Sequence, residues 1–308
     1  MKSNNYTLWT NDVETTSIWF NTLRDKTGEK VLREGMPELL DIYDNYNIKS
    51  TFFYTYYIAN KFPDIVKIAA EAGHEIASHG KSHLKENGFD VMPFERQKRH
   101  LIESKKLLED ISGQEIISFR APALRVNEET AQALIEAGYK IDSSIASQRF
   151  DFFLSFGGRT KLNWLKAPRK PYMINSDNIF KKGIGPLIEI PLSAFVLPYL
   201  GTTMRVFPGI TNMQKWFIHY ESSLTGKPVV FDIHPNEFID ESDEPRKITS
   251  RSKNPVAYFL QDWLRSNLKV KNLGPEARPI YEQQIKFFKD RGYKSTTIKQ
   301  YCKEIELI

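Results

Sequence analysis

Residues 73–83 read GHEIASHGKSH, in which a short apolar run leads into two histidines, His79 and His83, four residues apart. The run has the length and composition of a buried strand. Similar runs recur along the chain and also end in polar residues. The strand candidates are residues 6–11, 49–54, 74–78, 116–119, 139–142, 187–192 and 228–234. His79 and His83 therefore follow one strand of a repeated pattern.

Apolar residues at helical spacing separate these strands. The clearest helical patterns cover residues 36–46, 62–72, 93–111 and 128–137. Gly73, Gly113 and Gly138 follow three of them, where a glycine often ends a helix. The alternation predicts a parallel α/β fold, either a barrel or a doubly wound sheet. No composition shift marks a linker, so we expect one domain over 1–308 with insertions at about 147–185 and 240–277.

Composition narrows the classes of function. Lys plus Arg is 43 and Asp plus Glu is 38, a net charge of +5 that is too mild to predict nucleic-acid binding. The single cysteine excludes a disulfide within the chain and a cysteine-ligated zinc. No signal-peptide stretch and no apolar run of about 20 residues is present. We therefore expect a cytoplasmic protein that meets any membrane-linked substrate at the inner membrane surface.

Polar residues gather at the predicted strand ends, where active groups collect in α/β folds. The set is Asp12, Glu14, His79, His83, Arg120, Asp142, Asp232 and His234. If 79–83 forms a helical turn, both imidazoles share one face and can bind a metal together. Each residue also has a simpler explanation, such as a surface histidine, an acidic turn, a helix cap or a rim arginine.

The order of these segments resembles the polysaccharide deacetylase family, also called carbohydrate esterase family four. That family carries five short motifs along a distorted barrel. The matching segments are TNDVE at 10–14, SHGKSH at 78–83, FRAPA at 119–123, GYKIDSS at 138–144 and VVFDIHP at 229–235. The resemblance spans roughly residues 5–300, and LIEIPLS at 187–193 is similar to the penultimate strand. It implies a distorted (β/α)7–8 barrel with parallel strands and inserted loops.

The resemblance also implies a divalent metal held by Glu14, His79 and His83. Zinc suits two histidines and a carboxylate best, and cobalt, nickel or iron also fit such ligands. The first motif departs from the usual pair of adjacent aspartates, because here the second acid is Glu14 in an Asp-Val-Glu variant. This departure makes Glu14 the least certain of the three ligands.

Catalytic roles follow from the same motifs. The resemblance makes Asp12 the general base, paired with Arg120, and His234 the general acid. The backbone N–H of Ala123 would help to stabilise an oxyanion, and Asp142 would support the pocket. These groups suit amide hydrolysis, which needs an activated water, oxyanion stabilisation and an acid for the leaving amine.

The function implied is removal of an N-acetyl or N-formyl group from an amino sugar in bacterial envelope glycan or lipid-linked sugar assembly. One alternative is a family relative that hydrolyses a non-sugar cyclic amide. The other is an inactive barrel that binds glycan. Assays on N-acetylated sugars and cyclic imides, together with metal analysis, separate the three.

Aromatic and basic residues between 147 and 210 are candidates for the substrate side. We expect Trp164, Arg169, Tyr199 and Arg205 to bind substrate, with Phe150 and Arg159 among further residues of the same kind. Arginine recognises phosphate well, and exposed apolar surface can rest on lipid. This interpretation favours a nucleotide-linked or polyprenol-linked amino sugar and contact with the membrane. The alternative is a satellite hydrophobic cluster with a solvated basic rim.

Overall fold

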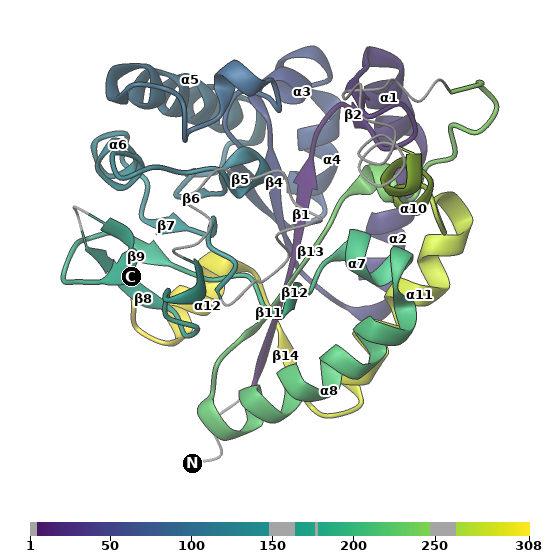
Figure 1. Ribbon diagram of the computed structural model, residues 1–308. Coiled ribbons are helices and arrows are strands. Elements are labelled where there is room, and N and C mark those ends of the chain that lie inside the picture. Colours follow the sequence, from purple (N-terminus) through teal and green to yellow (C-terminus); the bar gives the residue numbers. More distant parts are fainter. Residues whose placement is uncertain (1–4, 148–163, 176–177, 247–262) are drawn as a thin grey trace.

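A parallel sheet forms the centre of the protein (Figure 1). The computed structural model describes residues 5–147, 164–175, 178–246 and 263–308. The parallel strands, in spatial order, are β13 (Val229–Ile233), β1 (Tyr6–Val13), β4 (Thr51–Tyr54), β5 (Glu75–Ser78), β6 (Ser118–Phe119), β7 (Ile141–Asp142) and β10 (Ile188–Glu189). Each falls within or overlaps a strand expected from the sequence.

The chain after β10 brings the two ends of this sheet together. Ile190 N donates to Asp142 O at 2.8 Å on the β7 side, and Ser193 N then donates to Val230 O of β13 at 3.1 Å. Val230 N returns a hydrogen bond to Ser193 Oγ at 3.0 Å. The sheet therefore curls round on itself as a distorted α/β barrel, which confirms the predicted fold class.

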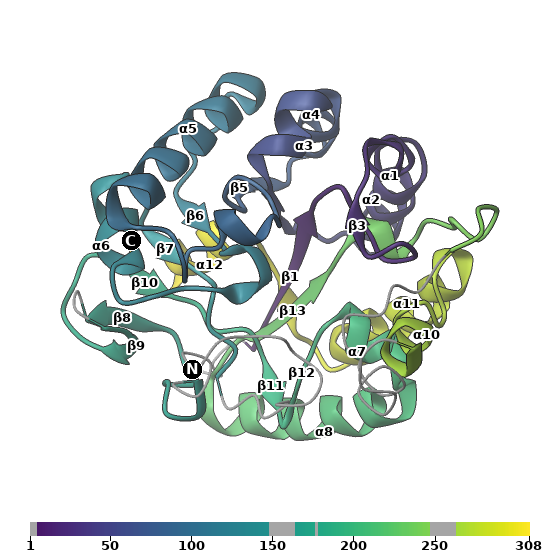
Figure 2. The ribbon, with the colours of Figure 1, turned by 45° about the horizontal axis from the view of Figure 1, so that its top comes forward.

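Helices cover the outside of the sheet (Figures 1 and 2). They are α1 (Asp25–Lys30), α2 (Met36–Tyr46), α3 (Tyr56–Lys61), α4 (Asp64–Glu71), α5 (Phe94–Ser112), α6 (Thr130–Glu136), α7 (Gly201–Val206), α8 (Pro208–Thr225), α10 (Arg265–Lys269), α11 (Ala277–Lys289) and α12 (Ile298–Glu304). Gly73, Gly113 and Gly138 have φ of +77°, +68° and +76°, so all three end their helices in the left-handed conformation, as expected. No helix of the described residues has the length and hydropathy needed to cross a membrane.

Seven further strands of the described residues are short. These are β2 (Thr16–Ser17), β3 (Thr22–Leu23), β8 (Tyr172–Asn175), β9 (Asn178–Lys182), β11 (Ala194–Phe195), β12 (Leu197–Pro198) and β14 (Lys294–Ser295). Strands β8, β9 and β14 extend the main sheet, whereas β2 with β3 and β11 with β12 form two separate antiparallel pairs. The first predicted insertion thus contains an antiparallel pair, β8–β9, that extends the sheet beyond β10. Residues 148–163, with Phe150 and Arg159, and residues 247–262 of the second predicted insertion lie outside the described part.

Aromatic side chains pack β1 against β13 and the outer helices. Phe231 of β13 lies with its ring centroid 5.6 Å from that of Trp9 of β1 and 5.5 Å from that of Tyr281 of α11. The Tyr43 hydroxyl lies 2.8 Å from that of Tyr281, and Trp9, Tyr43, Phe231 and Tyr281 are all buried. This packing holds the two strands in parallel register, so their polar carboxyl ends lie side by side.

Candidate active site

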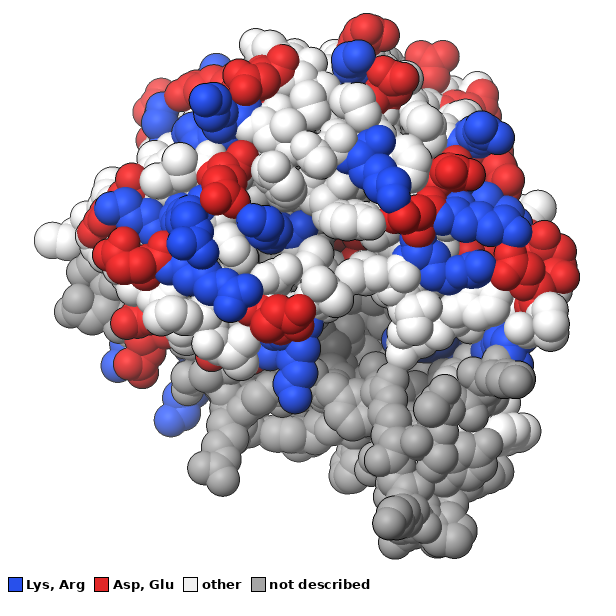
Figure 3. Space-filling model, turned by 90° about the horizontal axis from the view of Figure 1, so that it is seen from above, with Lys and Arg blue, Asp and Glu red and all other residues white. Residues whose placement is uncertain are grey.

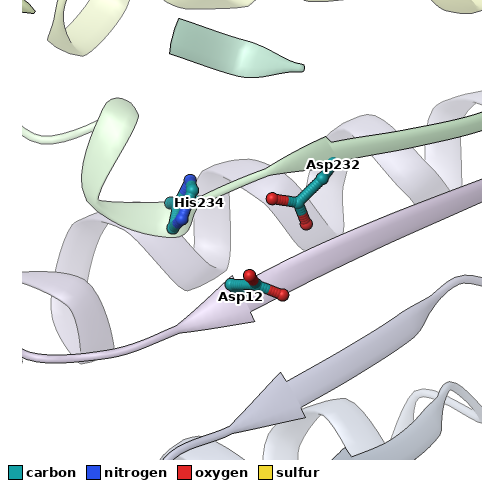
Figure 4. Close-up of side chains that lie close together, drawn as sticks. All are labelled: Asp12, Asp232 and His234. Atoms are coloured by element: carbon teal, nitrogen blue, oxygen red, sulfur yellow. The ribbon is translucent and has the colours of Figure 1, made fainter. Parts of the chain in front are cut away.

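Arg120 joins two carboxylates at the carboxyl ends of neighbouring strands. Asp12 lies near the end of β1 and Asp232 lies on β13, and Figure 4 shows the two side chains pointing toward one another. The buried Arg120, which follows β6, donates from Nη1 to Asp12 Oδ1 at 2.9 Å and to Asp232 Oδ1 at 2.7 Å. Its Nε and Nη2 donate to Ser143 O and Ser143 Oγ, both at 3.0 Å, which fixes the guanidinium plane.

The two carboxyls that share Arg120 differ in how easily they ionise. Burial raises the pKa of Asp12, but nearby His79, Arg120 and His234 outweigh it and hold the pKa below its usual range. Burial and the charge of Asp12 raise the pKa of Asp232. Two carboxyls this close do not both ionise easily. The structure therefore favours Asp12 as the carboxylate and Asp232 as the member that accepts a proton more readily.

The two histidines of the SHGKSH segment meet beside Asp12. His79 Nδ1 lies 2.9 Å from Arg120 O, and because a carbonyl oxygen only accepts, this nitrogen carries the proton. His79 Nε2 is left with its lone pair and lies 3.0 Å from His83 Nε2 and 3.5 Å from Asp12 Oδ2. A metal-binding histidine typically has this arrangement, with the ring nitrogen away from the metal donating to a carbonyl.

Residues 79–83 form a bend and not the helical turn that the spacing predicted. Gly80 makes the bend possible, because its φ is +65° and a Cβ there would lie 2.9 Å from the Phe89 ring. The imidazoles still converge because the left-handed glycine turns the chain back toward the strand end.

Glu14 completes this group. Its Oε2 lies 2.8 Å from His83 Nε2 and accepts a hydrogen bond from Thr16 Oγ1, also at 2.8 Å. Burial opposes ionisation, but His83 lowers the pKa of Glu14 to about 2, so the side chain is a carboxylate. His83 Nε2 thus lies within 3.0 Å of both His79 Nε2 and Glu14 Oε2, and two imidazole nitrogens with one carboxylate oxygen are a suitable donor set for zinc or a related divalent ion.

A second set of potential ligands lies beside the first and shares no residue with it. Asp12, Asp232 and His234 each offer a ligand atom within 4.8 Å of the others (Figure 4). Two of these three already accept hydrogen bonds from the Arg120 cation, which would repel a metal ion placed between them. The Glu14, His79 and His83 side chains accept no hydrogen bond from Arg120, although Glu14 Oε1 lies 3.9 Å from His234 Nε2, and this set stays the predicted metal site.

His234 follows β13 and is held by a buried carboxylate. Its Nδ1 lies 3.1 Å from Glu237 Oε1, and its Nε2 lies 3.9 Å from Glu14 Oε1. Burial disfavours the charged ring, but the Glu237 hydrogen bond, Asp232 and Asp12 raise the pKa of His234 to about 10. Glu237 is itself paired with the fully buried Arg205. The result is an imidazolium whose Nε2 lies on the site side, as a proton donor needs.

Asp142 lies beneath this layer and not on Arg120 or His234. Its Oδ1 accepts from Ser144 Oγ at 2.6 Å, and Ser144 Oγ accepts from the Ala121 backbone N–H at 2.9 Å. Burial raises the pKa of Asp142 to about 6, and burial together with the Asp142 charge raises that of the neighbouring Glu189. Asp142 therefore supports the turn that follows Arg120, which is an indirect form of the support expected of it.

Comparison with known proteins agrees with this geometry. The model of the family described as polysaccharide deacetylase matches residues 16–141, which include His79, His83 and Arg120. A peptidoglycan deacetylase of Helicobacter pylori is 29% identical over 116 residues, covering 38% of this chain and 39% of that protein. Over this part of its length the chain is similar to the polysaccharide deacetylase family.

Solved structures of two other proteins have the same fold as this chain. A putative polysaccharide deacetylase from Mycobacterium smegmatis superimposes with a TM-score of 0.57 at 22% identity, covering 77% of this chain and 78% of that one. An allantoinase superimposes with a TM-score of 0.60 at 14% identity, covering 97% of this chain and 89% of that one. The chain spans 39% and 52% of the length of the first two curated relatives that it matches.

The residues expected to bind substrate contact other parts of the protein in the structure. Trp164 and Tyr199 are buried in the protein, and Tyr199 donates to Gln284 Oε1 at 3.0 Å. Arg169 binds Glu221 through Nε at 2.5 Å and Nη2 at 2.6 Å. Arg205 is fully buried against Glu237 and the carbonyls of Lys269 and Lys271. The expectation that Arg169 and Arg205 present free cations to a phosphate is therefore wrong, because their N–H groups already have protein acceptors.

Arg205→Met is expected to lower the free energy of unfolding by about 3–5 kcal/mol, because it leaves Glu237 as a buried charge without its cation. Urea unfolding measures the change. Lys182→Met removes an exposed cation from β9 and should change stability by no more than about 0.5 kcal/mol. Equal, small effects at the two positions would contradict the structural role of Arg205.

Two members of the site were not predicted as such from the sequence. Asp232 was noted at a strand end without a role, and Glu237 was missed. Asp232 lies two residues before His234 on a strand, so both side chains project to the same side, and this spacing was an available signal. Glu237 lies three residues after His234 in a 3₁₀ turn (Pro235–Glu237). Residues three apart lie on the same face of such a turn, so this spacing was also an available signal.

Proposed function

We propose that this chain is a metal-dependent hydrolase that removes an N-acetyl or N-formyl group from an amino sugar during assembly of bacterial envelope glycans. The observation that carries the proposal is the convergence of Glu14, His79 and His83 beside the Arg120-bound Asp12, with His234 across from them. The proposal treats residues 1–308 as one catalytic domain in the cytoplasm, with zinc as its metal. The similarity to the polysaccharide deacetylase family supports a deacetylase reaction. The substrate and the complete reaction are part of the proposal.

Asp12 is the proposed general base. A divalent ion held by Glu14, His79 and His83 would supply Lewis acidity for water and for the amide carbonyl. Asp12 Oδ1 is engaged by Arg120, while Oδ2 lies 3.5 Å from His79 Nε2, on the side of the ligand atoms. Oδ2 is therefore the oxygen placed to accept the proton of the attacking water, and Arg120 keeps it ionised at neutral pH.

His234 is the proposed general acid. Its Nδ1–H donates to Glu237, which leaves a protonated Nε2 on the site side of the ring. Amide hydrolysis releases an amine, which leaves poorly until its nitrogen is protonated. Asp12 and His234 lie on adjacent strands, so base and acid can act on the two sides of one scissile bond.

Ala123 is the proposed oxyanion donor. It has φ +54° and ψ +22°, an unusual conformation for alanine, in the 3₁₀ turn Pro122–Leu124 directly after Arg120. Such strained backbone is often kept where it aims an N–H group at a ligand. Asp142, by holding Ser144 and through it Ala121, supports this turn.

The amino-sugar substrate rests on the family and on the surface of the site. The relatives include proteins named as peptidoglycan deacetylases. Viewed from the end where β1 finishes, the described part of the face carries acidic and basic side chains interspersed among uncharged residues (Figure 3). A mixed face of this kind suits a neutral sugar better than a large polyanion. Since Arg169 and Arg205 are engaged elsewhere, recognition of a phosphate or polyprenol phosphate would need other cations.

A panel of substrates tests the reaction. We expect the metal-loaded protein to deacetylate an N-acetylated amino sugar with a kcat/KM at least about 100-fold above that for a cyclic ureide or imide, since positioned polar groups discriminate strongly. Chitooligosaccharide, a nucleotide-linked N-acetylamino sugar and a polyprenyl-phosphate N-acetylamino sugar form the sugar arm, and the best of them identifies the linkage. Faster hydrolysis of the cyclic amide, or no hydrolysis of any by protein with bound metal, would refute the proposal.

A further inference from the structure

Helix α8 has the reverse of the usual amphipathic pattern. Its exposed apolar residues are Ile210 (42% exposed), Met213 (56%), Trp216 (53%), Phe217 (47%), Tyr220 (66%) and Leu224 (67%). Its buried residues are mostly polar: Thr211, Gln214, Lys215 and Ser222, with Ile218. A surface helix normally hides its apolar residues and exposes its charged ones. The outer face of α8 therefore has the composition of a buried surface.

The six exposed apolar residues form one continuous stripe. Their spacing of three, four and seven residues places them on one face of a helix with 3.6 residues per turn. Phe195 of β11 extends this face, because its ring stacks on Phe217 with centroids 4.6 Å apart. The helix lies on the outside of the barrel in both views (Figures 1 and 2). We call these six residues of α8 together with Phe195 the α8 stripe.

The charges around the α8 stripe are one-sided. No Asp, Glu, Lys or Arg of α8 is exposed, and its one carboxylate, Glu221, is paired with Arg169 and Lys227. The guanidinium of Arg291 lies over the Trp216 ring at 4.5 Å and over the Phe287 ring at 3.7 Å. Among the described residues Arg291 and Lys215 form no ion pair. The stripe thus combines exposed aromatics with the exposed cation of Arg291, whereas Lys215 lies on the buried side of α8.

We propose that the α8 stripe docks this protein on an anionic lipid surface, with α8 lying flat in the headgroup region. Interfacial helices of this type bury an apolar face rich in Trp, Phe and Leu, and nearby cations attract anionic lipids. Trp and Tyr prefer the membrane–water interface. A second copy of the chain fits less well, because the one carboxylate of α8, Glu221, is already paired with Arg169 and Lys227 and leaves no acidic partner on α8 for the Arg291 of another copy. This docking is independent of the proposed reaction.

Vesicle binding of the full chain tests the proposal. Sedimentation compares vesicles of equal parts phosphatidylglycerol and phosphatidylcholine with vesicles of phosphatidylcholine alone. The variant M213Q/Y220Q/L224Q removes three exposed apolar groups spread along the stripe. The matched control I102Q/M173Q/I184Q alters three exposed apolar residues elsewhere, on α5, on β8 and after β9. Thermal unfolding of both variants checks that the fold is intact.

We expect the unmodified protein and the control to bind the anionic vesicles, more weakly at high salt, and the stripe variant to bind at least about tenfold more weakly. Light scattering should report the same oligomeric state for all three proteins. The proposal is overturned if the unmodified protein ignores the vesicles, if both variants lose binding equally, if lipid charge has no effect, or if the unmodified protein is a dimer that the stripe variant dissociates.

Discussion

His83→Ala is expected to purify with almost no bound metal and to lose hydrolase activity by about a thousandfold, because its Nε2 lies within 3.0 Å of both other predicted donor atoms, His79 Nε2 and Glu14 Oε2. Two remaining ligands hold a divalent ion poorly, and even a lost partner of a ligand typically costs about 10–100-fold in affinity. His79→Ala should behave in the same way. Metal analysis by mass spectrometry and an assay with added zinc measure both effects.

His219→Ala is the matched control for the metal ligands. His219 lies on α8, where its ring contacts Tyr293, away from the strand ends. This variant should keep full metal content and activity. Treating the unmodified protein with a chelator should reproduce the loss seen in His83→Ala, and zinc should reverse it only in the unmodified protein. Full metal occupancy in both His79→Ala and His83→Ala would show that the ion binds elsewhere, for example at Asp12, Asp232 and His234.

Asp12→Asn is expected to keep the metal and the fold while kcat falls by about 100- to 10,000-fold, the usual contribution of a general base. Asparagine retains the shape and can still accept a hydrogen bond from Arg120, but it cannot take a proton from water. Asp232→Asn is the matched comparison, because Asp232 accepts from the same Arg120 Nη1. We expect a much smaller loss at Asp232, whose pKa is raised by burial and by the charge of Asp12.

The comparison of these two variants decides which carboxyl is the base. Metal content and thermal unfolding are measured for both, so that a loss of structure is not mistaken for a loss of chemistry. If Asp232→Asn loses more activity than Asp12→Asn at equal metal content, the assignment of the base must be reversed. Near-normal turnover in both would place the base outside the Arg120 clamp.

Local sequence patterns predicted a parallel α/β fold because each element is specified by neighbours in the chain, and the choice of a barrel over a doubly wound sheet came from the family resemblance. The apolar runs at 6–11, 74–78 and 228–234 are too short for helices and have the length of strands. Glycines such as Gly113 end the helices between the strands. The sequence also singled out His79 and His83 as predicted ligands, from their spacing of four residues together with the family resemblance. The shape of their segment could not be predicted, because the bend depends on Gly80 turning against Phe89 and Pro122.

Only the tertiary structure decided which charged and apolar side chains, far apart in the chain, contact one another. By sequence Arg205 is a basic residue in an aromatic region, but folding buries it against Glu237, 32 residues away, so it supports His234 and is not free for phosphate. The residues of α8 have an ordinary helical pattern, and only packing shows that its polar side faces inward. Spacing fixes which residues share a face, whereas the direction of that face depends on long-range contacts that the fold alone supplies.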